Sequence, residues 1–312
     1  MINRRHIRIK VMQSFYALLQ SKSDDLPREQ KFLYFSIDKL YDLYVLQLTL
    51  LVEVQKMAKK RLSIAQKGRL GSIENQQAFT NLSNNRFLNI IEESVSLKEY
   101  IAAKNLNNWK DVTEYVQIIL DKIKENDLFI AYDKLKEPNF NEDKEFVITI
   151  FKEIVAPNDK LLDYYEDQYI GWVDDIPFVN TLISKNYAKI NKNSLFILRG
   201  LYKDEDDREL VKKLFTKSVL HHTEFDDEID KKTPNWDYDR IAGIDLLLIK
   251  MALVEFVYFP SIPTKVTINE YLEIAKNYSS DKSSFFINGV LDKIEKKYSK
   301  EGKINKIGRG LI

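Results

Sequence analysis

Basic residues crowd the first ten positions of the chain, where Arg4, Arg5, Arg8 and Lys10 lie close together. Positive charge gathered on one surface is what binding to nucleic-acid phosphates requires. In an arbitrary protein, however, such a cluster is more often a solvated helix end. Taken alone, the cluster leaves both interpretations open.

Two further stretches are basic, although the whole chain has 48 basic and 47 acidic side chains and a formal net charge of +1. Residues 56–69 contain six lysines and arginines and no acidic residue, and residues 293–309 form a basic tail. Residues 204–230 are rich in acidic residues and offset this charge. A solvated helix end is one interpretation of residues 56–69, and an added RNA surface is the alternative.

The sequence lacks several motifs that are typical of enzymes. The chain has no cysteine, and its nine glycines form neither a cofactor-binding strand-to-helix turn nor a P-loop. No G-x-S-x-G motif occurs. His221 and His222 are adjacent, so they cannot share one helix face to bind a metal. We therefore expect a non-enzymatic protein that has no metal and no cofactor.

Composition predicts an all-α fold built from long amphipathic helices. Of the 312 residues, 44% are hydrophobic and 30% are charged, and glycine and proline are scarce. The length predicts two domains, or one domain with a large insertion.

The most apolar run, 244–259, is interrupted by Asp245, Lys250 and Glu255 and is too short to span a membrane. The N-terminus has the basic residues of a signal peptide, but polar residues interrupt any apolar region and no cleavage site follows. Together with the absence of cysteine, this leads us to expect a cytoplasmic protein.

Hydrophobic residues recur at helical spacing along most of the chain. Gly68 and Gly71 mark a break after a long helical stretch. Expected helices are about residues 3–20, 27–66, 86–103, 109–136, 142–155, 161–169, 176–188, 237–259, 267–277 and 282–298.

A weak internal repeat appears when the chain is compared with itself at an offset of 64 residues. Residues 143–182 and 207–246 then share nine identities, including Asp143 with Asp207 and Phe151 with Phe215. Duplication of a helical unit is one interpretation, and two unrelated amphipathic helices with a common pattern is the other.

The last hundred residues contain the clearest local signals. The stretch 237–259 is apolar nearly all round, which predicts a central core helix. Thr267 and Glu270 have the spacing of a capping box at the start of the next helix. The last helix should bury Ile287, Val290, Leu291 and Ile294. It contains Gly289, and a close approach by another backbone would explain that residue.

Several short motifs follow one another in this region: Ile244-Asp245, Glu255-Phe256, Pro263, Val266 to Glu270, Glu273 to Lys276 and Phe286 to Asp292. Near the N-terminus, Arg4-Arg5-His6-Ile7-Arg8 is followed by Gln13 and Tyr16. Together these motifs resemble the NusB family of transcription antitermination factors, and the N-terminal segment is similar to that family's arginine-rich first helix. The resemblance covers about residues 3–20 and 205–298.

This resemblance implies two small helical bundles and a division of the chain into three parts. Residues 1–20 and 201–300 would form the NusB-like RNA-binding domain. Residues 21–200 would be a helical insertion that is folded rather than disordered, because apolar residues recur throughout it. Residues 301–312 would be a flexible basic tail.

The resemblance also implies a function and a set of contact residues. The protein would bind boxA-like single-stranded leader RNA together with the ribosomal protein NusE, and would act in the antitermination complex of RNA polymerase in ribosomal RNA operons. A helical scaffold without RNA binding is the alternative. No membrane is involved. The implied RNA-binding residues are Arg4, Arg5, Arg8, Tyr16, Tyr278, Lys282 and Phe286.

Overall fold

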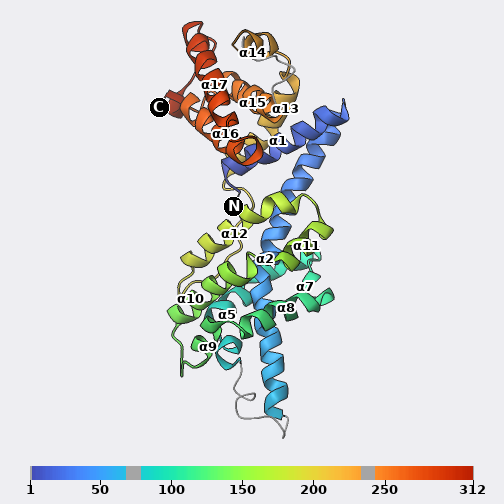
Figure 1. Ribbon diagram of the computed structural model, residues 1–312, viewed down its shortest axis with the longest axis vertical. Coiled ribbons are helices and arrows are strands. Elements are labelled where there is room, and N and C mark those ends of the chain that lie inside the picture. The colour runs from blue at the N-terminus through green and yellow to red at the C-terminus, as the bar shows by residue number, and fades with distance from the viewer. Residues whose placement is uncertain (1, 68–78, 233–242, 312) are drawn as a thin grey trace. The chain divides into compact units, whose positions relative to one another are not determined.

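The computed structural model describes residues 2–67, 79–232 and 243–311 of the chain, and Figure 1 shows its elements. All regular secondary structure over these ranges is helical. This confirms the predicted all-α class. The chain divides into two compact units: unit 1 comprises Met1–Ile37 and Leu201–Ile312, and unit 2 comprises Asp38–Gly200.

Unit 1 is built around one buried helix, α15 (Gly243–Tyr258), which packs against four other helices of the unit. The predicted central position of this apolar stretch is therefore confirmed over its described part. The packing partners of α15 are α1 (Arg4–Ser21), α13 (Glu205–Leu220), α16 (Thr264–Tyr278) and α17 (Ser283–Lys300), and α14 (Asp226–Lys232) packs against α17.

Two charged residues that interrupt the apolar sequence of α15 connect it to its surroundings. Asp245 accepts a hydrogen bond from Ser279 Oγ at 2.5 Å, in the turn between α16 and α17. Lys250 forms an ion pair with Asp226 of α14, with its Nζ 2.6 Å from the Asp226 carboxylate. A polar group inside an apolar core costs free energy unless it has a partner, and here each has one.

The boundary of unit 1 lies further along the chain than the resemblance suggests. Helix α2 (Leu26–Lys67) contributes its first residues, up to Ile37, to this unit. Leu33 and Ile37 are completely buried in the core of unit 1. Residues 21–37 therefore pack within unit 1, and the second unit begins at Asp38.

The residues after Lys300 pack against unit 1. The backbone N–H of Ile307 donates to the carbonyl of Pro260 at 3.0 Å. Lys306 Nζ donates to the carbonyls of Glu255 and Phe259, at 3.2 and 2.9 Å. These carbonyls lie at the C-terminal end of α15, where a helix leaves acceptors unsatisfied. The tail thus caps α15, which differs from the flexible tail that was expected.

Unit 2 is a second helical body, which confirms the prediction of an additional folded helical region. The remainder of α2 runs through it, with Leu43, Val45 and Leu48 completely buried. The other elements are α4 (Thr80–Ser83), α5 (Arg86–Glu92), α6 (Val95–Lys104), α7 (Asn108–Asp111), α8 (Thr113–Lys124), α9 (Asp127–Asp133), α10 (Phe140–Ile150) with a π-helical turn Phe151–Val155, α11 (Asp159–Gln168) and α12 (Trp172–Lys189).

Side-chain caps divide two of the predicted helices of unit 2. The expected helix 86–103 is α5 and α6, because Ser94 Oγ accepts a hydrogen bond from the N–H of Leu97 and starts a new helix there. The expected helix 109–136 is α7, α8 and α9. Asn126 starts the last of these by accepting from the N–H of Leu128.

The 64-residue repeat extends over three consecutive helices. Helix α10 with its π-helical turn corresponds to α13, α11 to α14, and α12 to α15. Trp236 and Asp239, which belong to the match, lie outside the described residues. The same positions are buried in both segments, as both interpretations of the match predict, because two unrelated amphipathic helices with a common pattern also bury corresponding residues. The buried pairs are Asp143 and Asp207, Phe146 and Leu210, Val147 and Val211, Ile150 and Leu214, Phe151 and Phe215, Leu161 and Phe225, Tyr165 and Ile229, Ile183 and Leu247, and Tyr187 and Met251.

Local expectations for the last two helices are partly wrong. Ile287, Val290, Leu291 and Ile294 are buried as predicted. Gly289, however, is exposed, and a Cβ added to it would meet nothing within 4 Å. The expected close approach by another backbone is therefore absent at this position.

The predicted capping box is also absent. Helix α16 begins at Thr264, three residues before Thr267, so Thr267 lies inside the helix and is completely buried. Its hydroxyl donates to the Glu255 carboxylate at 2.7 Å, and Glu270 binds Arg5. The T-x-x-E spacing places both side chains toward tertiary partners because residues three apart share a helix face.

Candidate nucleic-acid interface

Each of the three N-terminal arginines pairs with a carboxylate on a different helix. The most buried pair joins Arg8 of α1 to Glu255 of α15. Arg8 Nε and Nη2 donate to the two Glu255 oxygens at 2.9 and 2.7 Å, and the side chains are 2% and 0% exposed. This is the bidentate geometry that a planar guanidinium allows. Arg8 is therefore enclosed in the core, and no phosphate can reach it in this conformation.

Glu255 is the centre of a satisfied polar network. It accepts hydrogen bonds from the hydroxyls of Thr267 and Tyr271 as well as from Arg8. Burial alone would lower the pKa of Arg8, but the charge and the hydrogen bonds of Glu255 outweigh it and raise that pKa. Burial, with the nearby Glu255 charge, raises the pKa of Tyr271 well above its ordinary value. The raised pKa keeps the Arg8 guanidinium charged beside the Glu255 carboxylate.

Arg4 and Arg5 are held in a different way, at the surface. Arg4 Nε donates to Asp207 of α13 at 2.7 Å, and Arg5 donates two hydrogen bonds to Glu270 of α16, at 3.0 and 2.9 Å. Arg5 Nη1 also lies 3.8 Å from the carboxylate of Glu273. The hydrogen bond to Glu270 raises the pKa of Arg5. The side chains of Arg4 and Arg5 are 48% and 42% exposed, so part of each guanidinium faces solvent.

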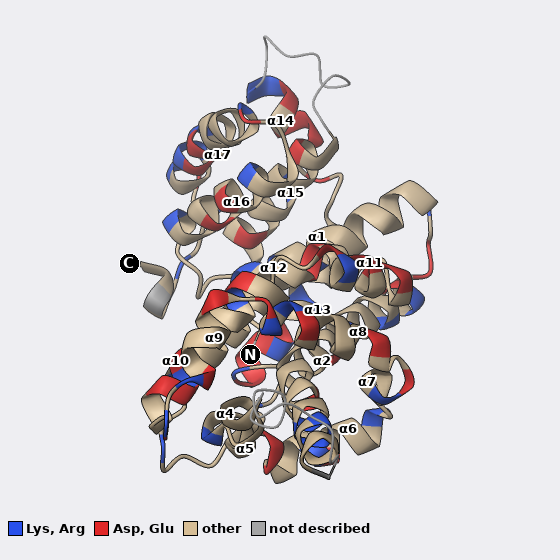
Figure 2. Cartoon of the chain, turned by 60° about the horizontal axis from the view of Figure 1, so that its bottom comes forward, with Lys and Arg blue, Asp and Glu red and all other residues tan. Residues whose placement is uncertain are grey.

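The positive charge of the cluster is largely balanced within the unit. Each arginine has one acidic partner at hydrogen-bonding distance, and Figure 2 shows acidic and basic residues interspersed along the helices. A neutralised surface attracts an anionic strand more weakly than an unpaired cluster does. Direct contacts at Arg4 and Arg5, rather than a strong long-range field, are what this surface can provide.

The other implied RNA-binding residues occupy three places in unit 1. Tyr16 is on α1 and is 38% exposed. It lies eleven residues after Arg5, so the two are about 16 Å apart along the helix and face nearly the same direction. Tyr278 ends α16 and Phe286 is in the first turns of α17, and both are half-buried against the core. Lys282 precedes α17 and is exposed.

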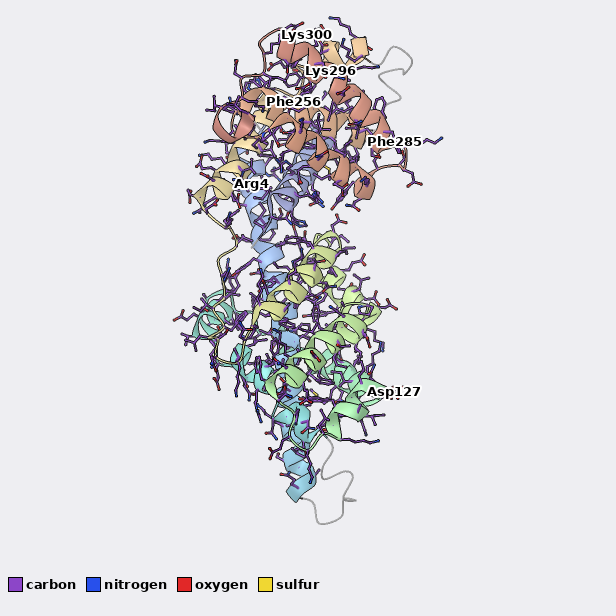
Figure 3. All side chains as sticks on the ribbon, turned by 90° about the vertical axis from the view of Figure 1, so that its left-hand side faces the viewer. Arg4, Asp127, Phe256, Phe285, Lys296 and Lys300 are labelled. Atoms are coloured by element: carbon purple, nitrogen blue, oxygen red, sulfur yellow. The ribbon has the colours of Figure 1, made fainter. Side chains whose placement is uncertain are left out.

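Phe285, which no sequence motif singles out, is the most exposed aromatic residue of α17. Its side chain is 81% exposed, and it is labelled in Figure 3. Phe286 beside it is half-buried, so the two phenylalanines point in different directions. Phe285 follows the exposed Lys282 by three residues, so the start of α17 offers a ring for stacking and a charge for phosphate, the two components of single-strand binding.

The second basic stretch is mostly paired within unit 2. Lys56 binds Glu53 at 2.7 Å, and Lys59 lies 3.5 Å from Glu92. Arg61 Nη1 lies 3.1 Å from the Asp121 carboxylate. Residues 68 and 69 lie outside the described residues. These pairs favour a solvated helix surface with acidic neighbours over a continuous RNA path along this helix.

The histidines form local contacts rather than a metal site. His221 Nδ1 lies 2.7 Å from Glu224, whose carboxylate also accepts a hydrogen bond from Tyr258. His222 contacts the carbonyl of Val219. Over the described ranges, no group of three acidic or histidine side chains is arranged to hold a metal ion.

Comparison with known proteins decides the family. Residues 175–296 match the model of the NusB family. The transcription antitermination protein NusB of Salinibacter ruber is 41% identical over 112 residues, which are 36% of this chain and 70% of that protein. The chain belongs to the NusB family. No solved structure matches it.

Two further NusB proteins show the same relationship. The one from Chloroherpeton thalassium is 39% identical over 105 residues, covering 34% of this chain and 50% of that protein. The one from Natranaerobius thermophilus is 38% identical over 91 residues, covering 28% of this chain and 66% of that protein. The NusB match therefore lies in the C-terminal region, and most of unit 2 lies outside it. In the part of the chain that the structure describes, no helix is long and apolar enough to cross a membrane.

Proposed function

We propose that this NusB-family protein acts in transcription antitermination by binding boxA-like single-stranded RNA together with the ribosomal protein NusE. It would join the antitermination complex of RNA polymerase in the cytoplasm and promote read-through in ribosomal RNA operons. The action is binding rather than catalysis. Support comes from the family membership and from the antitermination role in the names of its relatives.

One observation carries the RNA part of this proposal: the partly exposed guanidinium groups of Arg4 and Arg5. Asp207 and Glu270 hold these groups in place while leaving part of each accessible. A side chain that is already ordered loses less conformational entropy when a ligand binds. The carboxylates therefore favour binding by positioning the arginines, although they weaken the long-range attraction of phosphate.

Arg8 has a different role in this proposal. Because it is buried against Glu255, it positions α1 on α15 and does not contact RNA. Its hydrogen bond to the carbonyl of Arg4, at 3.3 Å, links this buried pair to the first turn of α1. Arg8 thus acts through Arg4 and Arg5.

Three aromatic side chains and one lysine complete the proposed RNA-binding surface. Tyr16, Tyr278 and Phe286 would contact bases, and Lys282 would contact a phosphate. The exposed ring of Phe285 joins this set on the basis of its exposure. NusE and RNA would strengthen each other's binding if both favour the same bound arrangement.

The test is a binding experiment with the full chain, boxA-like RNA and a scrambled RNA of equal length, each with and without NusE. The proposal predicts preferential binding of boxA-like RNA and a tighter complex when NusE is present. Equal, weak binding of both RNAs in all conditions would instead favour a helical scaffold without RNA binding.

A further inference from the structure

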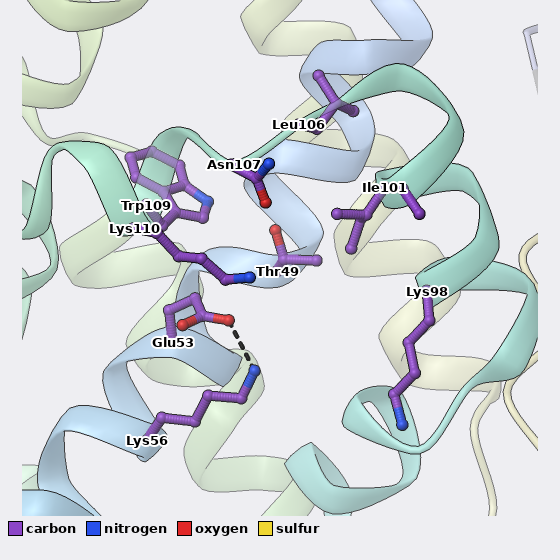
Figure 4. Close-up of a pocket in the computed structure, with 10 residues that line it drawn as sticks. Thr49, Glu53, Lys56, Lys98, Ile101, Leu106, Asn107, Trp109 and Lys110 are labelled. Carbon is purple, nitrogen blue, oxygen red and sulfur yellow. Dashed lines mark hydrogen bonds and ion pairs between the residues drawn. The ribbon is translucent and has the colours of Figure 1, made fainter.

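Unit 2 contains a pocket of about 300 Å³ between α2, α6 and α7. Figure 4 shows its lining side chains arranged around an open centre. Thr49 and Glu53 come from α2, Lys98 and Ile101 from α6, and Trp109 from α7. All these residues precede Asp175, where the NusB match begins. Neither the family match nor the proposed RNA surface of unit 1 uses the pocket.

One side of the pocket is apolar and held rigidly. Ile101, Leu106 and Trp109 form this wall. The indole of Trp109 donates to the carbonyl of Leu46 at 2.9 Å, and its ring packs against that of Tyr164 at a centroid distance of 5.6 Å. A wall fixed in this way keeps its shape, and a flat apolar group can pack against it.

The other side of the pocket is positively charged. Lys56, Lys98 and Lys110 line it, together with a single carboxylate, that of Glu53. Glu53 accepts a hydrogen bond from Lys56 at 2.7 Å. Within the described ranges, the side-chain ammonium groups of Lys98 and Lys110 have neither a hydrogen-bond partner nor an ion-pair partner, and only their backbone N–H groups are bonded, within the helices. The pocket thus has two uncompensated ammonium groups beside an apolar wall.

We propose that this pocket binds a nucleotide through its phosphate group. Lys98 and Lys110 would hold the phosphate as charged donors, and the base would lie against Ile101 and Leu106. The ammonium groups select an anion, and the apolar wall selects one that carries a flat ring. A bare carboxylate or phosphate would use only half of the pocket. The volume lies at the lower end of the range of small-molecule sites, which suits one nucleotide.

The phosphate can have two sources, a free nucleotide or one residue of an RNA strand. Both present the same chemistry to the two lysines. The site is independent of the arginines of α1, so it can bind nucleotide whether or not unit 1 binds boxA-like RNA.

The experiment uses the full chain and measures its affinity for AMP, adenosine, inorganic phosphate and a six-nucleotide RNA. The test variant is the double substitution Lys98→Gln and Lys110→Gln. Its matched control is Lys152→Gln with Lys160→Gln, which removes the same charge from exposed positions of unit 2 outside the pocket. All four positions are exposed, so each variant should retain the melting temperature of the wild type.

The wild type should bind AMP more tightly than adenosine or inorganic phosphate. The Lys98 and Lys110 variant should lose AMP affinity about tenfold or more, because both charge-assisted contacts to the phosphate are removed, and the control should stay within about twofold. Glu53→Gln should tighten AMP binding, because it removes the only carboxylate of the pocket.

The RNA measurement distinguishes the two sources. If the Lys98 and Lys110 variant loses affinity for AMP alone, the ligand is a free nucleotide. If it also loses affinity for the six-nucleotide RNA, the ligand is an RNA strand that passes through the pocket. The proposal is overturned if AMP binds the Lys98 and Lys110 variant as well as it binds the control, or if adenosine and AMP bind the wild type equally.

Discussion

The Arg8 guanidinium donates two hydrogen bonds to the carboxylate of Glu255, and both side chains are almost completely enclosed. A charge buried in this way is stable only when its partner is present, since desolvation costs several kcal/mol per ion. The pair joins α1, near the N-terminus, to α15, almost 250 residues later in the chain. The pair therefore helps to fix the position of α1 on α15.

Removing one partner of this pair should strongly destabilise the protein. Arg8→Met should lower the free energy of unfolding by about 3 to 5 kcal/mol, because Glu255 would stay buried without its cation. The double variant with Glu255→Met should be less destabilised than Arg8→Met alone, because no unpaired charge remains. Denaturant unfolding of wild type, both single variants and the double variant measures this. The account would be contradicted if the double variant lost as much free energy of unfolding as the two single variants lose together.

Removing Glu273 should strengthen RNA binding. Glu273 lies 3.8 Å from Arg5, whereas Glu270 holds Arg5 with two shorter hydrogen bonds. Glu273→Gln would remove a repulsive charge beside the proposed phosphate contact and leave Arg5 in position. Because the group is exposed and screened, we expect at most about a fivefold gain in affinity for boxA-like RNA at low salt. Glu301→Gln, which removes an acidic group from the end of α17, is the control. A weaker complex for Glu273→Gln would show that Glu273 positions the surface.

Gly289→Ala should stabilise unit 1. The position is exposed inside α17, and an added Cβ would meet nothing within 4 Å. Alanine favours the helix by about 0.5 to 1 kcal/mol relative to glycine. Gly310→Ala is the opposite control, because a Cβ there would lie 2.0 Å from the carbonyl oxygen of Pro260. Thermal unfolding should show a higher melting temperature for the first variant and a lower one for the second. A decrease for Gly289→Ala would indicate an unseen steric constraint.

Lys306 should make stability depend on pH in the alkaline range. Burial lowers its pKa from 10.5 to about 8, and the charge of Glu255 only partly opposes this. Between these values the folded protein loses the proton while the unfolded chain keeps it, so the free energy of unfolding rises as pH increases. Because the group is only half-buried, the rise between pH 7.5 and 9 should be at most about 1 kcal/mol.

Lys306→Met removes the titrating group, so its free energy of unfolding should not rise between pH 7.5 and 9. Lys303→Met removes an exposed lysine from the same tail and should keep the rise. Denaturant unfolding at pH 7.5, 8.25 and 9 measures all three proteins. The same pH dependence in wild type and Lys306→Met would contradict the assignment.

The sequence predicts the core of unit 1 well because its signals are local. An all-round apolar stretch defines α15, and helical spacing identifies the buried face of α17. Pairing between distant residues carries no such signal. Glu255 breaks the apolar run of α15, which indicates that it needs a cation, but nothing in its neighbourhood identifies Arg8 as that cation. For the same reason, the sequence does not show that one of the three arginines is buried and the other two are partly exposed.

Two other sequence predictions are wrong because tertiary contacts override the local structural preference of the residues. Thr267 and Glu270 have capping-box spacing, yet the ion pair with Arg5 and the network around Glu255 take both side chains. Residues 301–311 have the composition of a solvated tail, yet the end of α15 offers carbonyls that Lys306 can cap. In each case the tertiary partner, absent from the local sequence, decides the outcome.

The proposed RNA surface is tested most directly by the salt dependence of boxA-like RNA binding in the Arg4→Ala and Arg5→Ala double variant. Arg28→Ala with Lys293→Ala removes the same charge from exposed positions elsewhere in unit 1 and is the control. Affinity is measured over a range of salt concentrations after circular dichroism has shown that all three proteins are folded. We predict that the double variant binds more weakly and that its slope of log affinity against log salt falls by about 1.4, or 0.7 for each lost phosphate contact, while the control keeps the wild-type slope. An unchanged affinity and slope in a folded Arg4 and Arg5 variant would contradict the account.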